Sequence, residues 1–357
     1  MIEVPAGARV AVGMSGGVDS SVTAALLQAR GLDVFGLMLR LWSEGSQPNR
    51  CCTVDALAEA RYTAGQLGIP FYALDSQEAF RETVVEAFIQ GYRRGVTPNP
   101  CLVCNREIRW GFLLERARAL GADYLATGHY ARIRRFPPGP VQLLRGVDPG
   151  KDQSYVLHVL EQSTLRQTLL PLGQYTKAEV RKLAAEYDLP AADRPDSQDL
   201  CFVGEEDYRT FLKRKAPEVA QPGPILNTSG EELGRHPGLA FFTIGQRKGL
   251  GISPPEPHYV IEKDPSRNAL VVGPREHLGR DQLTASQVNW IAGKAPADPF
   301  PAGVKIRYRA REASAVVHPL PGQRVRVEFQ EPLRDITPGQ AAVFYQDDIC
   351  LGGGIIE

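Results

Sequence analysis

The residues best suited to chemistry lie near the amino terminus, in the sequence VGMSGGVDSS at positions 12–21. Gly16 and Gly17 let the backbone approach a ligand closely, and the N–H groups of such a turn and of the helix after it attract anions. Asp19 is a candidate to hold a magnesium ion beside phosphates. The Gly-Lys-Ser/Thr sequence of Walker loops does not follow the glycines. The sequence therefore predicts a phosphate-binding loop of another type.

Three cysteines form a second reactive group. Cys101 and Cys104 lie in TPNPCLVCNREIRW, just before an arginine-rich helical pattern, and Cys201 lies in the polar sequence DRPDSQDLCFVG. Thiols in such surroundings are expected to be reactive. Cys104 and Cys201 can form a sulfur-transfer pair, in which one carries a persulfide and the other attacks it or resolves it as a disulfide. The alternatives are an iron–sulfur cluster held by all three thiolates, or three ordinary thiols.

The other cysteines are expected to be unreactive. Cys51 and Cys52 are adjacent and too constrained to pair readily, and Cys350 lies in an apolar strand pattern typical of a core. Six cysteines in a chain of 357 residues do not make a disulfide scaffold.

Composition leaves the partner open. The chain has 41 Lys plus Arg and 41 Asp plus Glu, and a net charge of zero does not exclude a local basic face for nucleic acid. A membrane span needs about 18 consecutive apolar residues, and the sequence has no such run. The amino terminus resembles neither a signal peptide nor a transit peptide. We therefore expect a cytoplasmic protein without a membrane span.

The elements that position these residues predict an α/β fold in residues 1–150, a doubly wound parallel sheet with helices on both faces. Ligands bind such sheets at the carboxyl ends of the strands, so the glycine-rich loop, Leu39 and Gly128 should converge there. Strand and helix patterns alternate in the order 9–13, 20–30, 34–41, 54–67, 71–74, 77–92, 108–120 and 124–127.

Two further regions follow. Residues 131–147 predict a hairpin, and residues 151–220 predict a small, mainly helical central domain with helices at 163–169 and 176–187. A capping box of Thr176 and Glu179 is expected to begin the second helix. After a Pro/Gly-rich linker at 216–224, residues 221–357 predict a β-barrel or a pair of β-rich subdomains. The strand candidates there are 260–263, 269–272, 304–310, 313–318, 325–329, 341–345 and 349–356.

Over nearly its whole length the chain closely resembles the tRNA-specific 2-thiouridylase family. The resemblance implies an adenine nucleotide α-hydrolase-like domain with an ATP-pyrophosphatase loop, a small central domain and a C-terminal β-barrel. Nine motifs in the same order carry it: GMSGGVDSS, LGIPFY, NPCLVCN, TGHYAR, KDQSYVL, DSQDLCFVGE, FFTIGQRKGLGI, RYRA and PGQAAVFY.

The resemblance implies a tRNA-uridine 2-sulfurtransferase. ATP, with Mg²⁺, would adenylate the C2 oxygen of the wobble uridine, and sulfur from a cysteine persulfide would then give 2-thiouridine, AMP and pyrophosphate. The implied partners are a tRNA with a wobble uridine and a persulfide donor protein, either a cysteine desulfurase or a relay carrier.

The resemblance also implies roles for single residues, with Cys104 as the nucleophile and Cys201 as the persulfide carrier. Many members have Asp where this chain has Cys101, which keeps the iron–sulfur cluster with Cys101, Cys104 and Cys201 as ligands open. The implied ATP-binding residues are Gly13, Met14, Ser15, Gly16, Gly17, Val18, Asp19, Ser20, Leu39 and Gly128. The implied tRNA-binding residues are Asn99, Pro100, Cys101, His129, Lys151, Asp152, Gln153, Arg307, Tyr308 and Gln340.

Two rival functions are compatible with the loop. One is an amide-forming synthetase that uses ammonia, which would not need two reactive loop cysteines. The other is a tRNA-binding protein that holds ATP only as a structural ligand. Release of pyrophosphate that depends on tRNA distinguishes an enzyme from such a binding protein.

Overall fold

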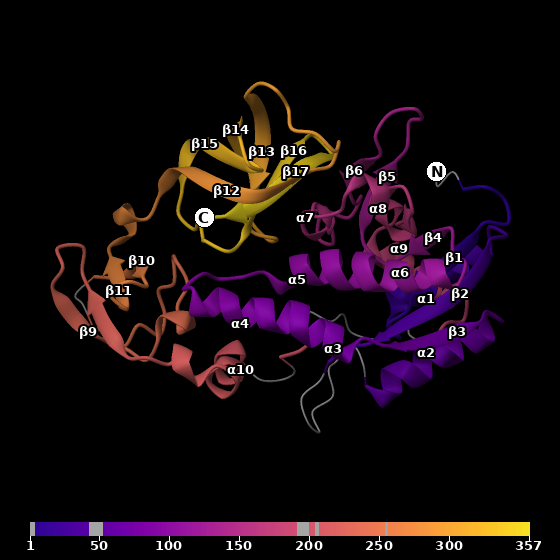
Figure 1. The fold of residues 1–357 in the computed structure, drawn as a ribbon, viewed down its shortest axis with the longest axis horizontal. Coiled ribbons are helices and arrows are strands. Elements are labelled where there is room, and N and C mark those ends of the chain that lie inside the picture. Colours follow the sequence, from indigo (N-terminus) through magenta and orange to yellow (C-terminus); the bar gives the residue numbers. More distant parts are fainter. Residues whose placement is uncertain (1–3, 43–52, 191–199, 204–206, 254–255) are drawn as a thin grey trace.

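The chain forms an N-terminal α/β region, a β-rich region in the middle and a C-terminal barrel (Figure 1). The computed structural model describes residues 4–42, 53–190, 200–203, 207–253 and 256–357. Cys51 and Cys52, which we expected to be unreactive, lie outside the residues that the structure describes.

The N-terminal sheet has five parallel strands in the order β3-β2-β1-β4-β7. The chain runs outward from β1 in one direction through β2 and β3, and in the other through β4 and β7. The strand order therefore reverses between β1 and β4, and that crevice is where such sheets bind ligands. The strands are β1 (Arg9–Gly13), β2 (Asp33–Arg40), β3 (Phe71–Asp75), β4 (Tyr124–Ala126) and β7 (Thr168–Leu169).

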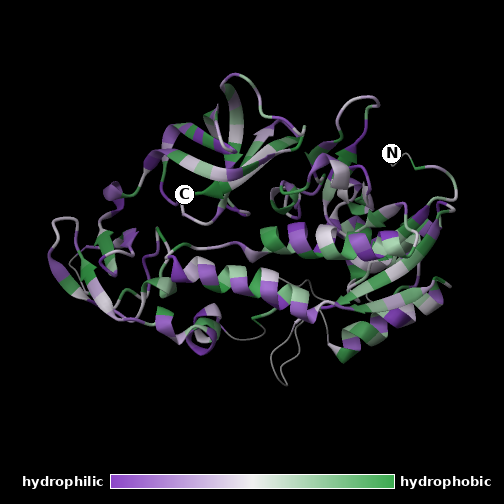
Figure 2. Ribbon diagram, in the orientation of Figure 1, coloured by the Kyte–Doolittle hydropathy of each residue, from purple (hydrophilic) through white to green (hydrophobic). Residues whose placement is uncertain are grey.

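Helices cover both faces of this sheet, because buried residues of β1 point alternately to opposite sides. Val10 packs in a cluster with α1 (Val18–Gln28) and α2 (Val54–Gln66). Ala11 packs on the other side, in a cluster with α6 (Leu113–Ala119). Figure 2 shows the strands of this sheet as largely hydrophobic. The predicted doubly wound fold is confirmed.

Two helical rods lie beside the sheet, and the first leads the chain away from it while the second leads the chain back (Figure 1). The first runs through α3 (Gln77–Phe80), the π-helical segment η1 (Arg81–Val85) and α4 (Glu86–Arg93). The second runs through α5 (Pro100–Val103), the π-helical segment η2 (Cys104–Phe112) and α6. π-Helical segments are rare and occur often at functional sites, and here one begins at a predicted catalytic cysteine.

The C-terminal region is a closed barrel, as predicted, because β12 pairs with both β15 and β17. Its order is β12-β15-β14-β13-β16-β17, and the predicted hairpin of β5 (Ala131–Arg134) and β6 (Gln142–Arg145) extends it by pairing with β17. The barrel strands are β12 (Arg280–Trp290), β13 (Phe300–Lys305), β14 (Ala313–Leu320), β15 (Arg324–Leu333), β16 (Ala341–Gln346) and β17 (Ile349–Ile356).

Short helices and a separate four-stranded sheet, ordered β10-β11-β8-β9, form the middle of the chain. The helices are α7 (Ser154–Leu157), α8 (Gln162–Leu165), α9 (Lys177–Glu186) and α10 (Tyr208–Lys215), with 3₁₀ turns η3 (Pro171–Gln174), η4 (Pro217–Val219), η5 (Leu239–Phe241) and η6 (Arg275–His277). The strands are β8 (Gly223–Leu226), β9 (Glu232–His236), β10 (Tyr259–Asp264) and β11 (Ala269–Gly273).

Some local predictions need correction. The helix expected at 163–169 ends at Leu165, because Thr168 and Leu169 pair with β4 instead. The strand expected at 304–310 ends at Lys305. The capping box of α9 is confirmed. The domain boundaries expected at residues 150 and 220 stay a prediction. Two strand pairs cross the first boundary, because β6 pairs with β17 and β7 pairs with β4.

Candidate functional site

The glycine-rich loop lies at the carboxyl end of β1, in the crevice next to β4. The backbone N–H of Ser15 donates to Ser20 Oγ at 3.1 Å, which closes the loop into a compact turn. Gly17 caps α1 without any side-chain hydrogen bond to the first N–H groups of the helix. Helix termini whose N–H groups are not capped by side chains bind anions. The predicted loop is thus placed and shaped for phosphate groups.

Gly16 must be glycine because of its backbone conformation and its close contact with α2. Its φ angle is +74°, and a Cβ atom there would lie 2.5 Å from the carbonyl oxygen of Ala56 in α2. Any other residue would strain the backbone and displace α2.

Gly128 lies across the crevice, just after β4. A Cβ atom at this position would lie 2.9 to 3.1 Å from the carbonyl carbon, the Cβ and the carbonyl oxygen of Asp19. The space beside Gly128 is therefore filled by the first turn of α1. This contact brings together two of the residues predicted to bind ATP.

Asp19 forms an ion pair that links three segments of the chain. Lys177 Nζ, on α9, donates to Asp19 Oδ1 at 2.8 Å and to Oδ2 at 2.9 Å, and Tyr130 Oη donates to Oδ1 at 2.6 Å. A magnesium ion on the same carboxylate would lie next to the lysine ammonium, and the two cations would repel each other. The expectation that Asp19 holds Mg²⁺ therefore does not fit this arrangement.

Met14 and Leu39 are held in the core around the loop. The Met14 backbone N–H donates to the carbonyl oxygen of Leu37 at 2.8 Å, and the Met14 side chain is buried. Leu39, on β2, packs against two clusters, one beneath the sheet and one that contains Phe88 and Phe202. Leu39 thus lies between the cluster that contains residues of α6 and the cluster that Cys104 and Cys201 pack against.

Cys104 and Cys201, far apart in the sequence, pack against the same apolar cluster. Phe202 directly follows Cys201, and its ring lies 5.2 Å from that of Phe88 on α4 and 5.5 Å from that of Phe211 on α10. These edge-to-face contacts hold the backbone next to Cys201 against the cluster that Cys104 also joins.

The four described cysteines form no disulfide bond in this structure. Among the described residues, no three or more His, Cys, Asp and Glu side chains are grouped closely enough to hold a metal ion. Cys101, Cys104 and Cys201 are all described, so they are not arranged here as ligands of one cluster. The iron–sulfur alternative is not favoured.

The segment before Cys101 is bound to the barrel. The backbone N–H of Thr97 donates to the carbonyl of Pro338, and Gln340 Nε2 donates to the carbonyl of Thr97, both at 2.9 Å. Asn99 Oδ1 accepts the backbone N–H of Cys101 at 3.1 Å and so begins α5, with Pro100 buried at its first position.

Two further residues predicted to bind tRNA lie close to this junction. Arg307 donates to Thr337 Oγ1 at 2.6 Å, in the barrel loop that contacts Thr97. The ring of Tyr308 lies 6.2 Å from that of Tyr155. Burial raises the pKa of the Tyr308 hydroxyl, and among nearby charges Asp152 and Cys101 add to this effect.

His129 is buried and its ring lies 5.3 Å from that of Trp110. Its Nδ1 lies 2.8 Å from Thr127 Oγ1. Burial, together with the charge of Arg109, lowers the pKa of His129 to about 3. The imidazole is therefore neutral at physiological pH and supplies no positive charge to RNA.

In the Lys151-Asp152-Gln153 segment, Asp152 and Gln153 form hydrogen bonds within the protein. Asp152 is buried, and its carboxylate accepts the backbone N–H groups of Gly146 and Ser154, each at 3.0 Å. Gln153 Oε1 accepts the backbone N–H of Tyr130 at 2.9 Å. The carboxylate of Asp152 and the amide oxygen of Gln153 are thus directed into the protein.

The sequence patterns do not identify Lys177 and Tyr130 as residues of the candidate site. Tyr130 lies inside the TGHYAR motif, and Lys177 is the first residue of a helix whose capping box was recognised. A local pattern cannot show that both side chains meet Asp19.

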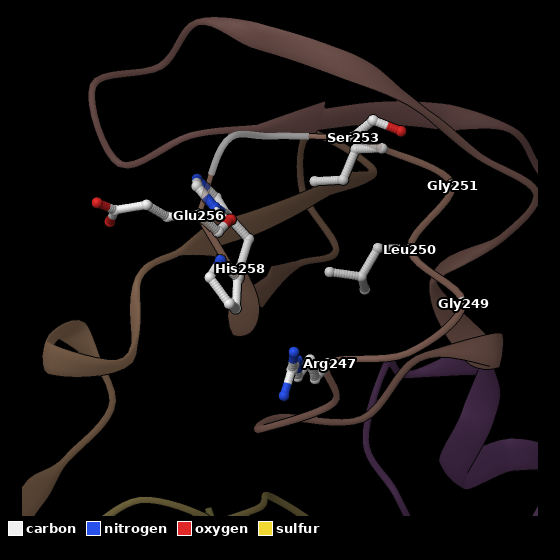
Figure 3. A pocket seen from close by; sticks show the side chains of 9 residues that line it. Arg247, Gly249, Leu250, Gly251, Ser253, Glu256 and His258 are labelled. Carbon is white, nitrogen blue, oxygen red and sulfur yellow. Dashed lines mark hydrogen bonds between the residues drawn. The ribbon is translucent and has the colours of Figure 1, made fainter.

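Two surface cavities lie elsewhere, around the sequence FFTIGQRKGLGI. One, of about 340 Å³, is lined among others by Arg247, Leu250 and His258, and Figure 3 shows Glu256 at its edge pointing away from them. The other, of about 580 Å³, includes Arg307 in its lining. Neither contains the glycine-rich loop or the cysteines.

In a comparison with known proteins, three family models match successive parts of the chain. Residues 8–205 match a model described as the tRNA methyl transferase HUP domain, residues 209–274 a PRC-barrel domain of the same group, and residues 280–356 an aminomethyltransferase β-barrel domain. Within the described residues, no helix is long and apolar enough to cross a membrane.

Curated relatives match along the whole chain. A protein of Moorella thermoacetica named tRNA-specific 2-thiouridylase MnmA is 52% identical over 97% of this chain and 98% of its own length. A protein of the same name from Symbiobacterium thermophilum is 49% identical over 99% of this chain and 93% of its own. A solved 4-thiouridine synthetase–RNA complex with bound ATP has a TM-score of 0.37 at 15% identity, over 60% of this chain and 52% of its own, which is too distant a likeness to inform the site.

Proposed function

The chain belongs to the tRNA-specific 2-thiouridylase family and is a tRNA sulfurtransferase, and from this premise we propose that it replaces the C2 oxygen of a wobble uridine with sulfur. The proposed reaction consumes ATP and releases AMP and pyrophosphate. The sulfur comes from a persulfide on Cys201, which a donor protein of the cytoplasm has loaded.

The glycine-rich loop supports the first half of the reaction. A carbonyl oxygen is a poor leaving group, and its transfer to the α-phosphate of ATP converts it into the good leaving group AMP. The first N–H groups of α1 and the Ser15 and Ser20 hydroxyls are suited to stabilise the negative charge on the departing pyrophosphate.

The observation that carries the proposal is that Cys104 and Cys201 pack against one apolar cluster, which Leu41 at the end of β2 also joins. Two thiols that must exchange sulfur have to meet, and both must lie near the carboxyl ends of the strands where the activated base would be bound. The arrangement supports both conditions.

The sulfur step balances without an external oxidant. The Cys104 thiolate attacks the inner sulfur of the Cys201 persulfide, a Cys104–Cys201 disulfide forms, and the outer sulfur leaves as hydrosulfide. The hydrosulfide attacks C2 of the activated uridine and displaces AMP. A dithiol reductant then returns both cysteines to thiols.

The junction between the α5 segment and the barrel is the proposed position of the target nucleotide. Thr97, two residues before Asn99, is hydrogen-bonded to the barrel residues Pro338 and Gln340, and Asn99 begins the helix that carries Cys101. A base in an anticodon loop has to be turned out of its stack to reach such a site, and the exposed Cys101 lies where it would enter.

The test uses the full chain with ATP, a tRNA that has a wobble uridine, and a cysteine desulfurase with cysteine as the sulfur source. Mass spectrometry of digested tRNA measures 2-thiouridine, and a coupled assay measures pyrophosphate. We expect Cys201→Ser and Cys104→Ser to abolish 2-thiouridine but to retain one turnover of tRNA-dependent pyrophosphate release. Full thiolation by Cys104→Ser would contradict the proposal, and so would pyrophosphate release that does not depend on tRNA.

A further inference from the structure

The ion pair at the start of α1 shows how the nucleotide site is supplied with positive charge. We propose that Lys177 is a phosphate-binding residue of this site, and that Asp19 and Tyr130 position it. This inference rests on the proposed function, because it requires ATP to be bound at the glycine-rich loop.

The position of Lys177 is fixed by the backbone and not by the ion pair alone. Its backbone N–H donates to Asp148 Oδ2 at 2.9 Å, and the capping box of Thr176 and Glu179 begins α9 at this residue. The two helices that carry the pair also share a core, in which Val18 of α1 packs with Val180 of α9. The ammonium group is therefore held next to the loop even when its side chain changes partner.

The charge balance of the loop requires a cation. Asp19 lies in the first turn of α1, directly beside the N–H groups that would bind phosphates. The phosphates of ATP bring several further negative charges, and the Asp19 carboxylate would repel them. Lys177 Nζ lies within 2.9 Å of both carboxylate oxygens, and its side chain is only 12% exposed. A poorly hydrated ammonium beside a binding loop attracts phosphate strongly.

The chemistry of lysine suits a change of partner. The ammonium group is a compact charge with three donors on a flexible stem, so it can keep one bond to Asp19 and direct another to a phosphate oxygen. Tyr130 Oη donates to Asp19 Oδ1 and holds the carboxylate in place during such a movement.

The test measures ATP affinity by calorimetry, with the full chain and without tRNA. We expect Lys177→Gln to weaken ATP binding by about 10- to 100-fold, which is the contribution of a charge-assisted hydrogen bond. Lys182→Gln is the matched control on the exposed side of the same helix, and we expect its affinity to be unchanged.

Lys177→Gln leaves Asp19 without its cation, and weaker ATP binding could then result from unfolding of the protein. A second variant distinguishes the two causes. The double variant Asp19→Asn with Lys177→Gln removes both charges, and we expect it to fold and to bind ATP less weakly than the single variant, because Asp19 no longer repels the phosphates, but still more weakly than the unmodified chain. ATP affinity of the unmodified chain in both would overturn the inference and leave the proposed function intact. An unmodified chain that binds no ATP would overturn the proposed function itself.

The effect of magnesium on ATP affinity distinguishes two possible roles of Asp19, positioning Lys177 or binding the metal ion. If Asp19 positions Lys177, the ratio of ATP dissociation constants with and without magnesium is the same in Asp19→Asn as in the unmodified chain. If Asp19 were a magnesium ligand, that ratio would fall to one in the variant, and the positioning role of Asp19 would be wrong.

Discussion

The side chain of Gln340 donates a hydrogen bond of 2.9 Å to the carbonyl oxygen of Thr97. One residue belongs to the barrel and the other begins the segment that leads to Cys101. Because the backbone N–H of Thr97 also donates to the barrel loop, at Pro338, the cysteine segment has a fixed position relative to a surface that is remote in sequence.

We expect Gln340→Ala to weaken this connection. Loss of one hydrogen bond of this kind changes the free energy by about 0.5–1.5 kcal/mol, so the KM for tRNA should rise up to about tenfold. Steady-state kinetics with varied tRNA measures this. Gln346→Ala is the control, since its exposed side chain lies at the end of the neighbouring strand β16. Equal effects of the two substitutions would contradict the assignment.

We expect Gly128→Ala to impair nucleotide binding. The added Cβ would lie 2.9 to 3.1 Å from atoms of Asp19, so the first turn of α1 must shift. Calorimetry with ATP and thermal unfolding measure the two effects. Gly65→Ala provides a contrast, because no atom lies within 4 Å of a Cβ there. In the helix α2 it should stabilise the protein by about 0.5–1 kcal/mol.

Cys101→Ser distinguishes the thiol pair from an iron–sulfur cluster. The proposed sulfur step uses only Cys104 and Cys201, so this variant should keep most of its thiolation activity when a persulfide donor is supplied. Mass spectrometry of the tRNA product measures it. Complete loss of 2-thiouridine, together with loss of iron from anaerobically purified protein, would restore the cluster alternative.

Thr168 connects the rod that carries Cys104 to the edge of the sheet. Trp110 Nε1 donates to Thr168 Oγ1 at 2.8 Å in a buried position. Thr168→Val leaves this donor without its partner and should destabilise the chain by about 1–3 kcal/mol, measured by urea unfolding. Thr168→Ser keeps the hydroxyl and should lose much less, and a loss as large as that of the valine variant would show that packing dominates.

The free energy of unfolding should fall as the pH is lowered below the pKa that histidine has in the unfolded chain. Burial lowers the pKa of His129 to about 3 and that of His158 to about 4. In the unfolded chain histidine titrates near about 6.5. Below that value the unfolded chain binds more protons, so each of these histidines lowers the free energy of unfolding by up to about 1.4 kcal/mol per pH unit.

Urea unfolding at about pH 7 and about pH 5 measures this loss. We expect His129→Asn to reduce the pH dependence, because the substituted side chain does not titrate. An unchanged slope in His129→Asn would show that this imidazole is protonated in the folded protein.

The N-terminal elements follow from the sequence because each has a strong local signal. β1 begins and ends where its apolar run predicts, and the capping box of α9 is present in the structure. β12 was missed for a physical reason. Leu283 and Ala285 alternate as a strand requires, but Gln287, with φ of +52°, accompanies an irregular register that interrupts the alternation.

The candidate site was predictable only in part. The glycine-rich loop and the cysteines have local signatures of residue type and spacing. The ion pair between Asp19 and Lys177, and the hydrogen bond between Gln340 and Thr97, join side chains from distant segments. Such contacts depend on how the helices and the barrel pack, which no short pattern contains.

The pairing of β6 with β17 has a consequence for how the polypeptide can be divided. Leu143 and Leu144 lie opposite Cys350 and Ile349, so a hairpin from the first half of the chain covers the start of β17, outside the stretch of this strand that pairs with β12. A fragment that starts after this hairpin would leave the backbone groups at the start of β17 unpaired on that side and tend to self-associate. The two pieces of a chain cut near residue 150, produced together in one cell, should instead recover each other as a non-covalent complex.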